Sequence, residues 1–255
     1  ARTAKDAEHY YASYVHAIDA IGKAAKLKSP AENPGISVKL SALHPRYEFA
    51  KHDRVMRELP PLLLALAQQA KQYNIGFTVD AEEADRLDLS LDIFEKVFSD
   101  PSLNGWEGFG LAVQAYQKRA FYVLDWLADL SQRQQRRIMV RLVKGAYWDA
   151  EIKMSQIQGL VNYPVFTRKY STDVSYLACA KKLLARPDYF YPQFGTHNAY
   201  SAAAILTLAN SSKTNFEFQC LHGMGRPLYD QIVAADKSNQ PCRIYAPVGT
   251  HRDLL

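Results

Sequence analysis

The residues best suited to chemistry in this 255-residue chain lie in and just after an apolar segment near its middle. Arg141 interrupts the apolar run, and Lys144, Gly145, Tyr147 and Trp148 follow it closely. A buried charge without a partner is costly, so these cations must meet either acids of the chain or an anionic ligand. Because glycine lets the backbone approach closely, two cations beside it resemble a cradle for an anion or a phosphate. The two aromatic side chains could stack on a flat heterocycle or seal the rim of a barrel.

Polar side chains also stand near the carboxyl ends of the other apolar segments. In chain order these are Lys39, Asp80, Gln114, the triplet Thr196, His197 and Asn198, the pair Gln219 and His222, and the pair Arg243 and Tyr245. Lys39 and Asp80 could form a buried ion pair with each other instead of binding a ligand. Gln114 could bond to the backbone, and Thr196 or Asn198 could cap a helix.

Several familiar catalytic signatures are missing from the sequence. No second histidine stands at HxH or HxxxH spacing from His197 or His222, so we expect no metal site. There is no GxSxG motif, no Walker loop and no GxGxxG after an apolar segment, so a nucleotide cofactor would have to bind without the dinucleotide fold. Cys179, Cys220 and Cys242 have no CxxC spacing, and we interpret them as buried thiols in a reducing compartment.

The composition is that of a soluble globular protein, with 48% hydrophobic and 22% charged residues. No run approaches the roughly 20 apolar residues of a membrane span, and the first residues lack the apolar core of a signal peptide, so we expect a cytoplasmic protein. The net charge is +5, but the cations are scattered among 26 acids. The one dense basic run, QRQQRR at 132–137, falls where a helix should end. We therefore expect that this segment does not bind nucleic acid.

Short apolar segments alternate with longer stretches of helical spacing along the chain. The predicted strands are 35–41, 75–81, 108–114, 137–144, 190–196, 215–221 and 241–246. The predicted helices are 6–24, 50–73, 83–98, 117–134, 171–185, 199–208 and 227–235. Strict alternation favours an α/β fold with a parallel sheet, either open or closed into a barrel. No linker divides residues 1–255, so we expect a single domain.

The number of elements favours a truncated barrel. The chain opens on a predicted helix and ends after a predicted strand, which gives seven of each. A closed (β/α)8 TIM-like barrel would therefore lack its first strand and its last helix. In such a barrel the chemistry gathers at the carboxyl ends of the strands, where the polar side chains described above stand.

A set of longer motifs, spread in order along the chain, allows a family comparison. The motifs are GISVKLSALHPRY, VDAEEADR, AVQAYQKR, RLVKGAYWDAEIK, YSTDVSYLACAKKLL, QFGTHNA, FEFQCLHGMG and RIYAPVGTH. They resemble the proline dehydrogenase domain of the bifunctional proline utilisation A flavoproteins, and the resemblance runs essentially from the first residue to the last. It implies a distorted (β/α)8 barrel that binds FAD without a covalent bond.

The resemblance also implies an activity. The domain would oxidise L-proline to Δ1-pyrroline-5-carboxylate by hydride transfer to flavin N5 and pass the electrons to a membrane quinone. The protein would then be cytoplasmic, and in its full-length form peripheral at the cytoplasmic face of the membrane. Holding the reacting carbon against the flavin and stabilising the negative charge that the reduced ring gains would be the main tasks of the protein.

Carried over by motif, the resemblance assigns roles to named residues. Arg141, beside flavin N5, would act in catalysis together with Asp80 and Lys39. The proline pocket would consist of Lys39, Asp80, Tyr245 and Leu221. The FAD-binding residues would be Gln114, Arg141, Val143, Lys144, Gly145, Ala146, Tyr147, Trp148, Thr167, Arg168, Lys169, Thr196, His197, Asn198, Gln219, Cys220 and Leu221.

Two departures from the family pattern keep other functions open. The family clamps the proline carboxylate with two arginines on its eighth helix and has a glutamate on its first strand, and we expect both to lie outside this chain. One alternative is therefore an inactive fragment that lacks this clamp. The other is a lysine-dependent barrel aldolase in which Lys39 or Lys144 forms a Schiff base.

Overall fold

A single sheet of parallel strands forms the centre of the molecule. The computed structural model describes residues 1–210, 212, 214–234, 238 and 240–247. The strands of the sheet follow one another in chain order, each parallel to the next. They are β1 (Gly35–Val38), β2 (Gly76–Val79), β3 (Phe109–Gln114), β4 (Ile138–Val143), β5 (Phe190–Gly195), β6 (Glu217–Leu221) and β7 (Cys242–Tyr245).

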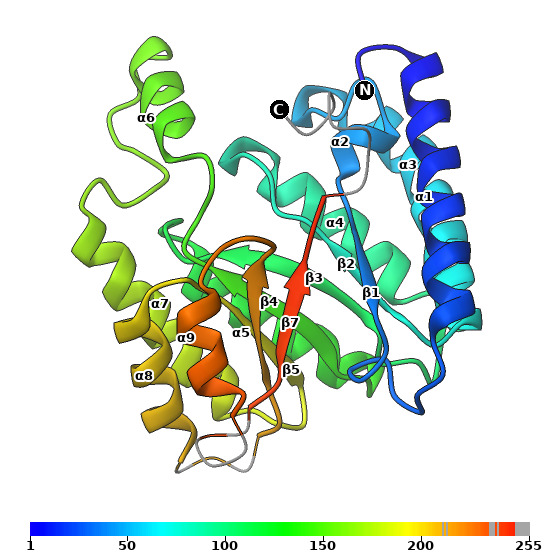
Figure 1. Cartoon of the computed structure of the whole chain (residues 1–255). Coiled ribbons are helices and arrows are strands. Elements are labelled where there is room, and N and C mark those ends of the chain that lie inside the picture. The colour runs from blue at the N-terminus through cyan, green and yellow to red at the C-terminus, as the bar shows by residue number, and fades with distance from the viewer. Residues whose placement is uncertain (211, 213, 235–237, 239, 248–255) are drawn as a thin grey trace.

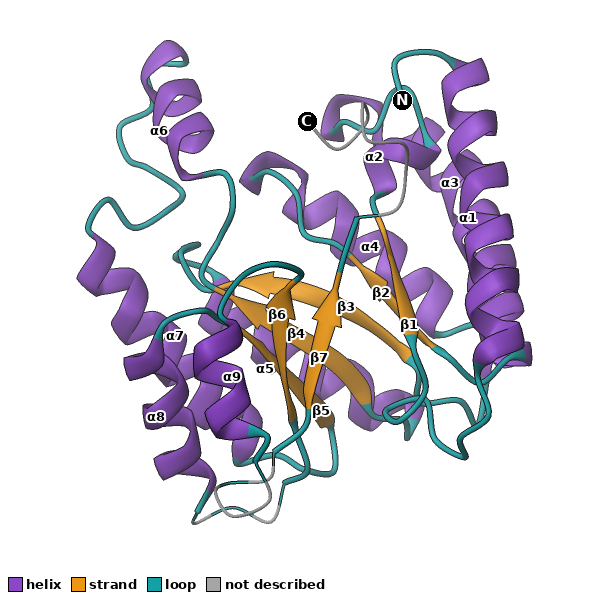
Figure 2. Cartoon of the chain, viewed as in Figure 1, coloured by secondary structure: helices purple, strands orange, loops and turns teal. Residues whose placement is uncertain are grey.

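Helices cover the outer face of this sheet (Figure 2). The helices of the described residues are α1 (Ala4–Ala24), α2 (Leu40–Leu43), α3 (His52–Gln72), α4 (Leu87–Phe98), α5 (Ala120–Gln134), α6 (Trp148–Ile157), α7 (Lys169–Leu184), α8 (Ala199–Ala209) and α9 (Arg226–Ile232). Three short 3-10 turns complete the list, at Phe49–Lys51, Ala84–Arg86 and Pro101–Leu103. Figure 1 shows that α6 projects away from the sheet, whereas most of the longer helices pack along it.

Alternation along the strands separates an apolar outer face from a polar inner face. The outward side chains, such as Phe77, Leu142 and Phe218, belong to the main hydrophobic core and are fully buried. Successive strand residues point to opposite faces, so Arg141 and Glu217 point inward. The register supports this assignment, because Arg141 pairs with Gln193, which pairs in turn with Glu217. The helices therefore cover the apolar face, and the interior of the curled sheet holds the polar groups.

Hydrogen bonds between distant strands show how strongly the sheet curls. Arg141 on β4 donates through Nη2 to Ser37 Oγ on β1 at 2.6 Å. Arg243 on β7 donates to the carbonyl oxygens of Asn33, at 2.7 Å, and Ala31, at 2.5 Å, just before β1 begins. The two ends of the sheet thus approach each other at the amino end of β1. The predicted α/β class is confirmed, as a curled half-barrel of seven parallel strands.

The predicted strand segments each contain a strand, but one helix was not predicted and the bounds of one strand were wrong. Residues 148–157 were not predicted as a helix, yet they form α6. Only Glu151 and Ser155 are buried on α6, so it has no apolar stripe of helical period to detect. The first predicted strand was too long, because the chain turns into the short helix α2 at Leu40. The predicted end of the last helix, at residue 235, lies outside the described residues, and α9 ends at Ile232.

Helix α3 accommodates two consecutive prolines, Pro60 and Pro61, in its interior. A proline has no N–H group, so the carbonyl four residues earlier loses its helical partner. For Pro60 this carbonyl belongs to Met56, and it accepts a hydrogen bond from Lys96 Nζ of α4 at 3.0 Å. The side chain of the neighbouring helix thus replaces the missing backbone donor.

The basic run at 132–137 is engaged within the protein. Arg133 pairs with Glu95 and Asp129, and Arg137 pairs with Glu107. Arg136 is buried, at 6% exposure, and donates to the carbonyl oxygens of Phe98 and Leu103. Burial lowers the pKa of its guanidinium to about 10.

Helix α6 is fastened to the rest of the molecule by a buried acid. Glu151 is 6% exposed, and its Oε1 accepts a hydrogen bond from the backbone N–H of Ala84 at 2.6 Å. Burial raises the pKa of the Glu151 carboxyl, the Ala84 hydrogen bond opposes this rise, and the nearby acids Asp85 and Glu83 add to it. The folded protein therefore binds a proton at Glu151 more tightly than the unfolded chain does.

Two inward-facing glycines on neighbouring strands give a matched test of the packing. A Cβ atom at Gly110 would stand 2.1 Å from the Met139 carbonyl oxygen, whereas one at Gly76 would meet nothing closer than 3.6 Å. We expect Gly110→Ala to lower the free energy of unfolding by about 1–3 kcal/mol through overpacking. Gly76→Ala should raise it by up to about 1 kcal/mol, because it restricts the unfolded chain. Urea unfolding measures both, and equal losses would contradict the described contact between β3 and β4.

The pH dependence of stability tests the burial of Glu151. Because its folded-state pKa is raised, the contribution of this carboxyl is fully present below its ordinary pKa of 4.5 and is lost as the pH rises through the folded value. Glu151→Gln keeps the acceptor for Ala84 but cannot ionise. The stability of the variant relative to the unchanged protein should therefore increase as the pH rises from 4.5. Urea unfolding at a series of pH values checks this, and a constant difference would refute it.

Candidate active site at the carboxyl ends of the strands

The carboxyl ends of the parallel strands meet at one edge of the curled sheet, as the sequence predicts (Figure 1). The inward side chains nearest this edge come from both halves of the chain. They are Lys39, Asp80, Gln114, Arg141, Gln219, Leu221 and Tyr245. Strand order alone therefore gathers residues that are up to about two hundred positions apart in sequence.

Arg141 lies at the centre of this group and is 9% exposed. Its Nε donates to Gln219 Oε1 at 2.7 Å, its Nη1 to Asp80 Oδ1 at 2.7 Å and its Nη2 to Ser37 Oγ at 2.6 Å. The guanidinium also stands 5.4 Å from the centre of the Tyr245 ring. A planar fork with fixed donors suits several partners in different directions, and here they come from four strands besides its own.

Asp80 and Lys39 do not form the ion pair that the sequence left open, since Asp80 pairs with Arg141. Burial raises the pKa of the Asp80 carboxyl, and the charges of Arg141 and Lys39 oppose that rise. The Lys39 Nζ stands 3.4 Å from the Tyr147 hydroxyl oxygen. Burial lowers the pKa of the Lys39 ammonium, but Tyr147, Asp80 and Glu82 raise it by more, so the net shift is upward. Lys39 is therefore held in its charged form.

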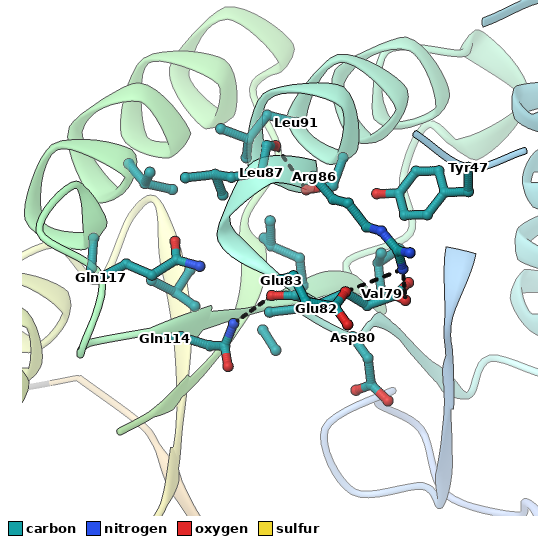
Figure 3. Close-up of a pocket in the computed structure, with 17 residues that line it drawn as sticks. Tyr47, Val79, Asp80, Glu82, Glu83, Arg86, Leu87, Leu91, Gln114 and Gln117 are labelled. Carbon is teal, nitrogen blue, oxygen red and sulfur yellow. Dashed lines mark hydrogen bonds and ion pairs between the residues drawn. The ribbon is translucent and has the colours of Figure 1, made fainter. Parts of the chain in front are cut away.

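Gln114 is 3% exposed and both ends of its amide are occupied. Its Nε2 donates to the Glu82 carbonyl oxygen at 2.8 Å, and its Oε1 accepts from the Ala146 N–H at 3.2 Å. The first of these bonds is visible in Figure 3, together with Arg86, which bridges Glu82 and Glu83. Gln114 thus ties the loop after β2 to the loop after β4.

The cavity drawn in Figure 3 is not the site. It measures about 20 Å³ and lies between the outer face of β2 and β3 and the helices α4 and α5. The Asp80 carboxylate points away from Tyr47 and Gln117 in this view, toward the interior of the sheet. The cavity is too small for a ligand of several rings.

The structure separates the two cations that the sequence suggested as one cradle. Arg141 points to the inner face of the sheet, whereas Lys144, which directly follows β4, reaches toward α7. Lys144 Nζ forms an ion pair with Asp173 Oδ1 on α7 at 2.6 Å. Lys169 Nζ reaches the other oxygen of the same carboxylate at 2.8 Å. A pair of cations does exist beside this strand end, but its members are Lys144 and Lys169, with Asp173 between them.

The loop after β4 has little room for side chains. Gly145 has a φ of 143°, and a Cβ atom there would stand 2.5 Å from the Tyr116 ring. Trp148 is the first residue of α6; it is 42% exposed, and its Nε1 donates to the Phe166 carbonyl oxygen at 3.0 Å. The remaining predicted residues of this region are placed as follows: Val143 ends β4, Ala146 bonds to Gln114, Tyr147 contacts Lys39, and Thr167 and Arg168 are exposed just before α7 begins at Lys169.

The triplet after β5 has structural roles. Asn198 caps α8, because its Oδ1 accepts from the Ser201 N–H at 2.9 Å. Thr196 Oγ1 accepts from the Asn198 N–H at 3.2 Å. His197 Nε2 accepts from the Leu221 N–H at 3.0 Å, which links the ends of β5 and β6. The helix-cap alternative is confirmed for Asn198.

Strand β6 divides its predicted residues between the two faces. Gln219 and Leu221 face the interior, whereas alternation turns Cys220 toward the outer layer. Its Sγ stands 3.7 Å from Cys242 Sγ, among the buried residues of the core. Only the backbone of Cys220 can therefore reach the inner face.

The sequence analysis missed two inner residues that hold the site together. Ser37 bonds to Arg141, and Glu217, 2% exposed, accepts hydrogen bonds from Gln193, Gln219 and Arg243. Each precedes a predicted residue by two positions, so the period of a strand could have found them. In the described part of the chain, no three His, Cys, Asp or Glu side chains are arranged to hold a metal ion. None of its helices is long and apolar enough to cross a bilayer.

Comparisons with known proteins identify relatives of the chain and of its fold. The chain is 61% identical over 260 residues to the Bifunctional protein PutA of Klebsiella aerogenes, covering all of this chain and 20% of that protein. It is 28% identical over 191 residues to Proline dehydrogenase 1 of Bacillus subtilis, covering 74% of this chain and 54% of that one. A solved structure of Bradyrhizobium japonicum Proline Utilization A (PutA) matches the fold with a TM-score of 0.96 at 58% identity, over the full chain and 26% of that chain.

The chain thus spans about a fifth of the length of the PutA proteins it matches. A family model described as Proline dehydrogenase matches residues 1–255. The chain therefore belongs to the proline dehydrogenase family.

Proposed function

We propose that this chain is the catalytic unit of an FAD-dependent proline dehydrogenase within a (β/α)8 barrel. The observation that carries the proposal is Arg141, a fixed cation at the carboxyl ends of the strands whose three donors are held by Ser37, Asp80 and Gln219. Such a group suits a reaction that develops negative charge beside it. The family to which the chain belongs supports proline as the substrate.

The residues at this edge fit an FAD group. Phosphates need cations and N–H donors, and Arg168, Lys169 and the amino end of α8 provide both in exposed positions. A flat ring needs an aromatic or apolar wall close to the backbone, which Tyr147 and Gly145 offer. When bound, the flavin would supply the acceptor for a hydride. The FAD-binding residues assigned by the resemblance remain our prediction in full.

The residues of the chain would position and polarise the substrate. Oxidation removes a hydride from the carbon beside the proline nitrogen and a proton from that nitrogen, and a C=N double bond forms. Lys39, held in its charged form, and Asp80 would bind the polar groups of proline, with Tyr245 and Leu221 as the apolar wall of the pocket. Arg141 would keep a positive charge at the reacting centre throughout, because no proton transfer from a guanidinium is required.

The remaining features follow from the same proposal. The electrons would leave to a quinone at the membrane surface, and the protein would be cytoplasmic, peripheral to the membrane in its full-length form. The binding of nucleic acid is not assigned to this segment. Residues 1–255 would act as one domain.

A lysine-dependent aldolase is less well supported. A Schiff base needs a neutral amine, and its lysine is therefore usually desolvated with a lowered pKa. The pKa of Lys39 is raised instead. Lys144 Nζ is engaged by the Asp173 carboxylate at 2.6 Å and is not free to attack a carbonyl.

Flavin binding and turnover together test the proposal. The purified chain, mixed with FAD and desalted, should retain the absorption of a bound flavin, and proline should bleach it and reduce an added dye. The same assay on a chain extended by the next helix of the parent sequence tests for an inactive fragment. If neither form binds flavin, and borohydride traps a carbonyl substrate on the protein, the aldolase is correct and the proposal fails.

Substitution of Arg141 tests whether its charge contributes to catalysis. We expect Arg141→Met to reduce the kcat for proline about 100-fold or more, as for other fixed donors that stabilise developing charge. Arg141→Lys keeps the positive charge but not the planar guanidinium, so we expect a smaller decrease in kcat. Arg137→Met is the matched control, because Arg137 pairs with Glu107 outside the site and should keep its kcat within about twofold. Equal effects at both arginines would contradict the role of Arg141.

A further inference from the structure

A second layer of polar side chains lies below Arg141 and is built on Glu217. The Glu217 carboxylate accepts from Gln193 Nε2 at 2.9 Å, from Gln219 Nε2 at 2.8 Å and from Arg243 at 2.8 and 2.9 Å. At 2% exposure it is almost closed to solvent. A carboxylate of this kind only accepts hydrogen bonds, so it dictates which atom each neighbour must turn toward it.

Gln219 is the neighbour for which this matters most. Its amide has a donor end and an acceptor end, and the donor end is fixed by Glu217. The acceptor end, Oε1, must then face the opposite way, where it receives Arg141 Nε at 2.7 Å. If the amide turned over, its NH2 group would face the donor of Arg141, and both groups would lose their partners.

We propose that Glu217 is a positioning residue of the active site and that it acts through Gln219 to fix Arg141. Glu217 does not touch Arg141, so its influence passes along the bonded series from carboxylate to amide to guanidinium. The effect on turnover rests on the proposed function, whereas the restraint of Arg141 does not. The two can be measured separately.

The bonded series from Glu217 through Gln219 to Arg141 is called the relay below. The charge of Glu217 is compensated by a group outside this relay. Arg243 contributes two hydrogen bonds to the carboxylate and is itself held by the carbonyl oxygens of Asn33 and Ala31. Gln193 contributes a further donor from β5. It is the register partner of Arg141 on the neighbouring strand, but its Nε2 bonds to Glu217 and Met139 and not to Arg141. Loss of the Gln193 bond would therefore disturb Glu217 without breaking its link to Gln219, which makes Gln193 a matched control.

Proton exchange at Arg141 Nε tests the restraint directly. In the ¹⁵N-labelled chain the Nε–H signal of Arg141 is identified by its loss in Arg141→Lys. We expect Glu217→Gln to speed its exchange with water about tenfold or more, since a hydrogen bond to a charged group is lost. Gln193→Leu should leave the rate within about twofold. If both variants change the rate equally, or neither does, the proposal is overturned.

Gln219→Met keeps the test decisive if Glu217→Gln does not fold. This substitution removes the middle residue of the relay and leaves Glu217 bonded to Arg243. It should speed the exchange of the Arg141 Nε proton as much as Glu217→Gln does. In the double variant the two effects should not add, because both act on one series of bonds. Full additivity, or an unchanged rate in Gln219→Met, would refute the relay.

A second test measures kcat and KM for proline with the FAD-loaded protein. Glu217→Gln should reduce kcat about tenfold with a smaller change in KM, whereas Gln193→Leu should retain kcat. If no variant and no unchanged protein oxidises proline, the proposed function fails and the exchange measurement still decides the relay. If kcat is unaffected while exchange rises, Glu217 holds Arg141 but does not position it for the reaction, and the proposal is wrong.

Discussion

A nearly buried cation inside the sheet is the constraint on which the rest of this structure depends. Removing a guanidinium from water is costly, and partners with good geometry must offset the cost. Because its nitrogens point in different directions, no single strand can supply all the acceptors of Arg141. Ser37, Asp80 and Gln219 can reach it only if the sheet curls. The curl of the sheet and the burial of this charge therefore depend on each other.

The same logic continues below Arg141. Acidic and basic groups alternate through the interior. Asp80 pairs with Arg141, Gln219 bonds to both Arg141 and Glu217, and Glu217 pairs with Arg243. Most apolar side chains of the strands point the other way, toward the helices. An interior of this kind is not the packed apolar layer that fills many barrels. It is suited to hold a polar ligand at its open end, above a base in which Glu217 accepts hydrogen bonds from Gln219 and Arg243.

The sequence predicts those parts of the molecule that depend on local pattern. Each strand was found because apolar, β-branched runs stand between helical stretches, and Arg141 and Asp80 were found because they stand at strand ends. Helix α6 was missed, since its buried residues are polar. The partner of Lys144 could not be predicted either, because Asp173 lies on a helix whose position depends on tertiary packing. Which acid meets which cation is a matter of register and curl, and neither can be deduced from the residues alone.

The contacts of Arg243 have a consequence for the order in which the protein assembles. The hydrogen bonds from Arg243 to Asn33 and Ala31 join residues 210 and 212 positions apart. Contacts of such long sequence separation form slowly, because a large loop must close before they contribute. On the ribosome, β1 to β4 can associate while β7 is still unsynthesised, but the two ends of the sheet cannot yet meet. The charged interior therefore stays accessible to water until β7 has been synthesised and pairs with β6.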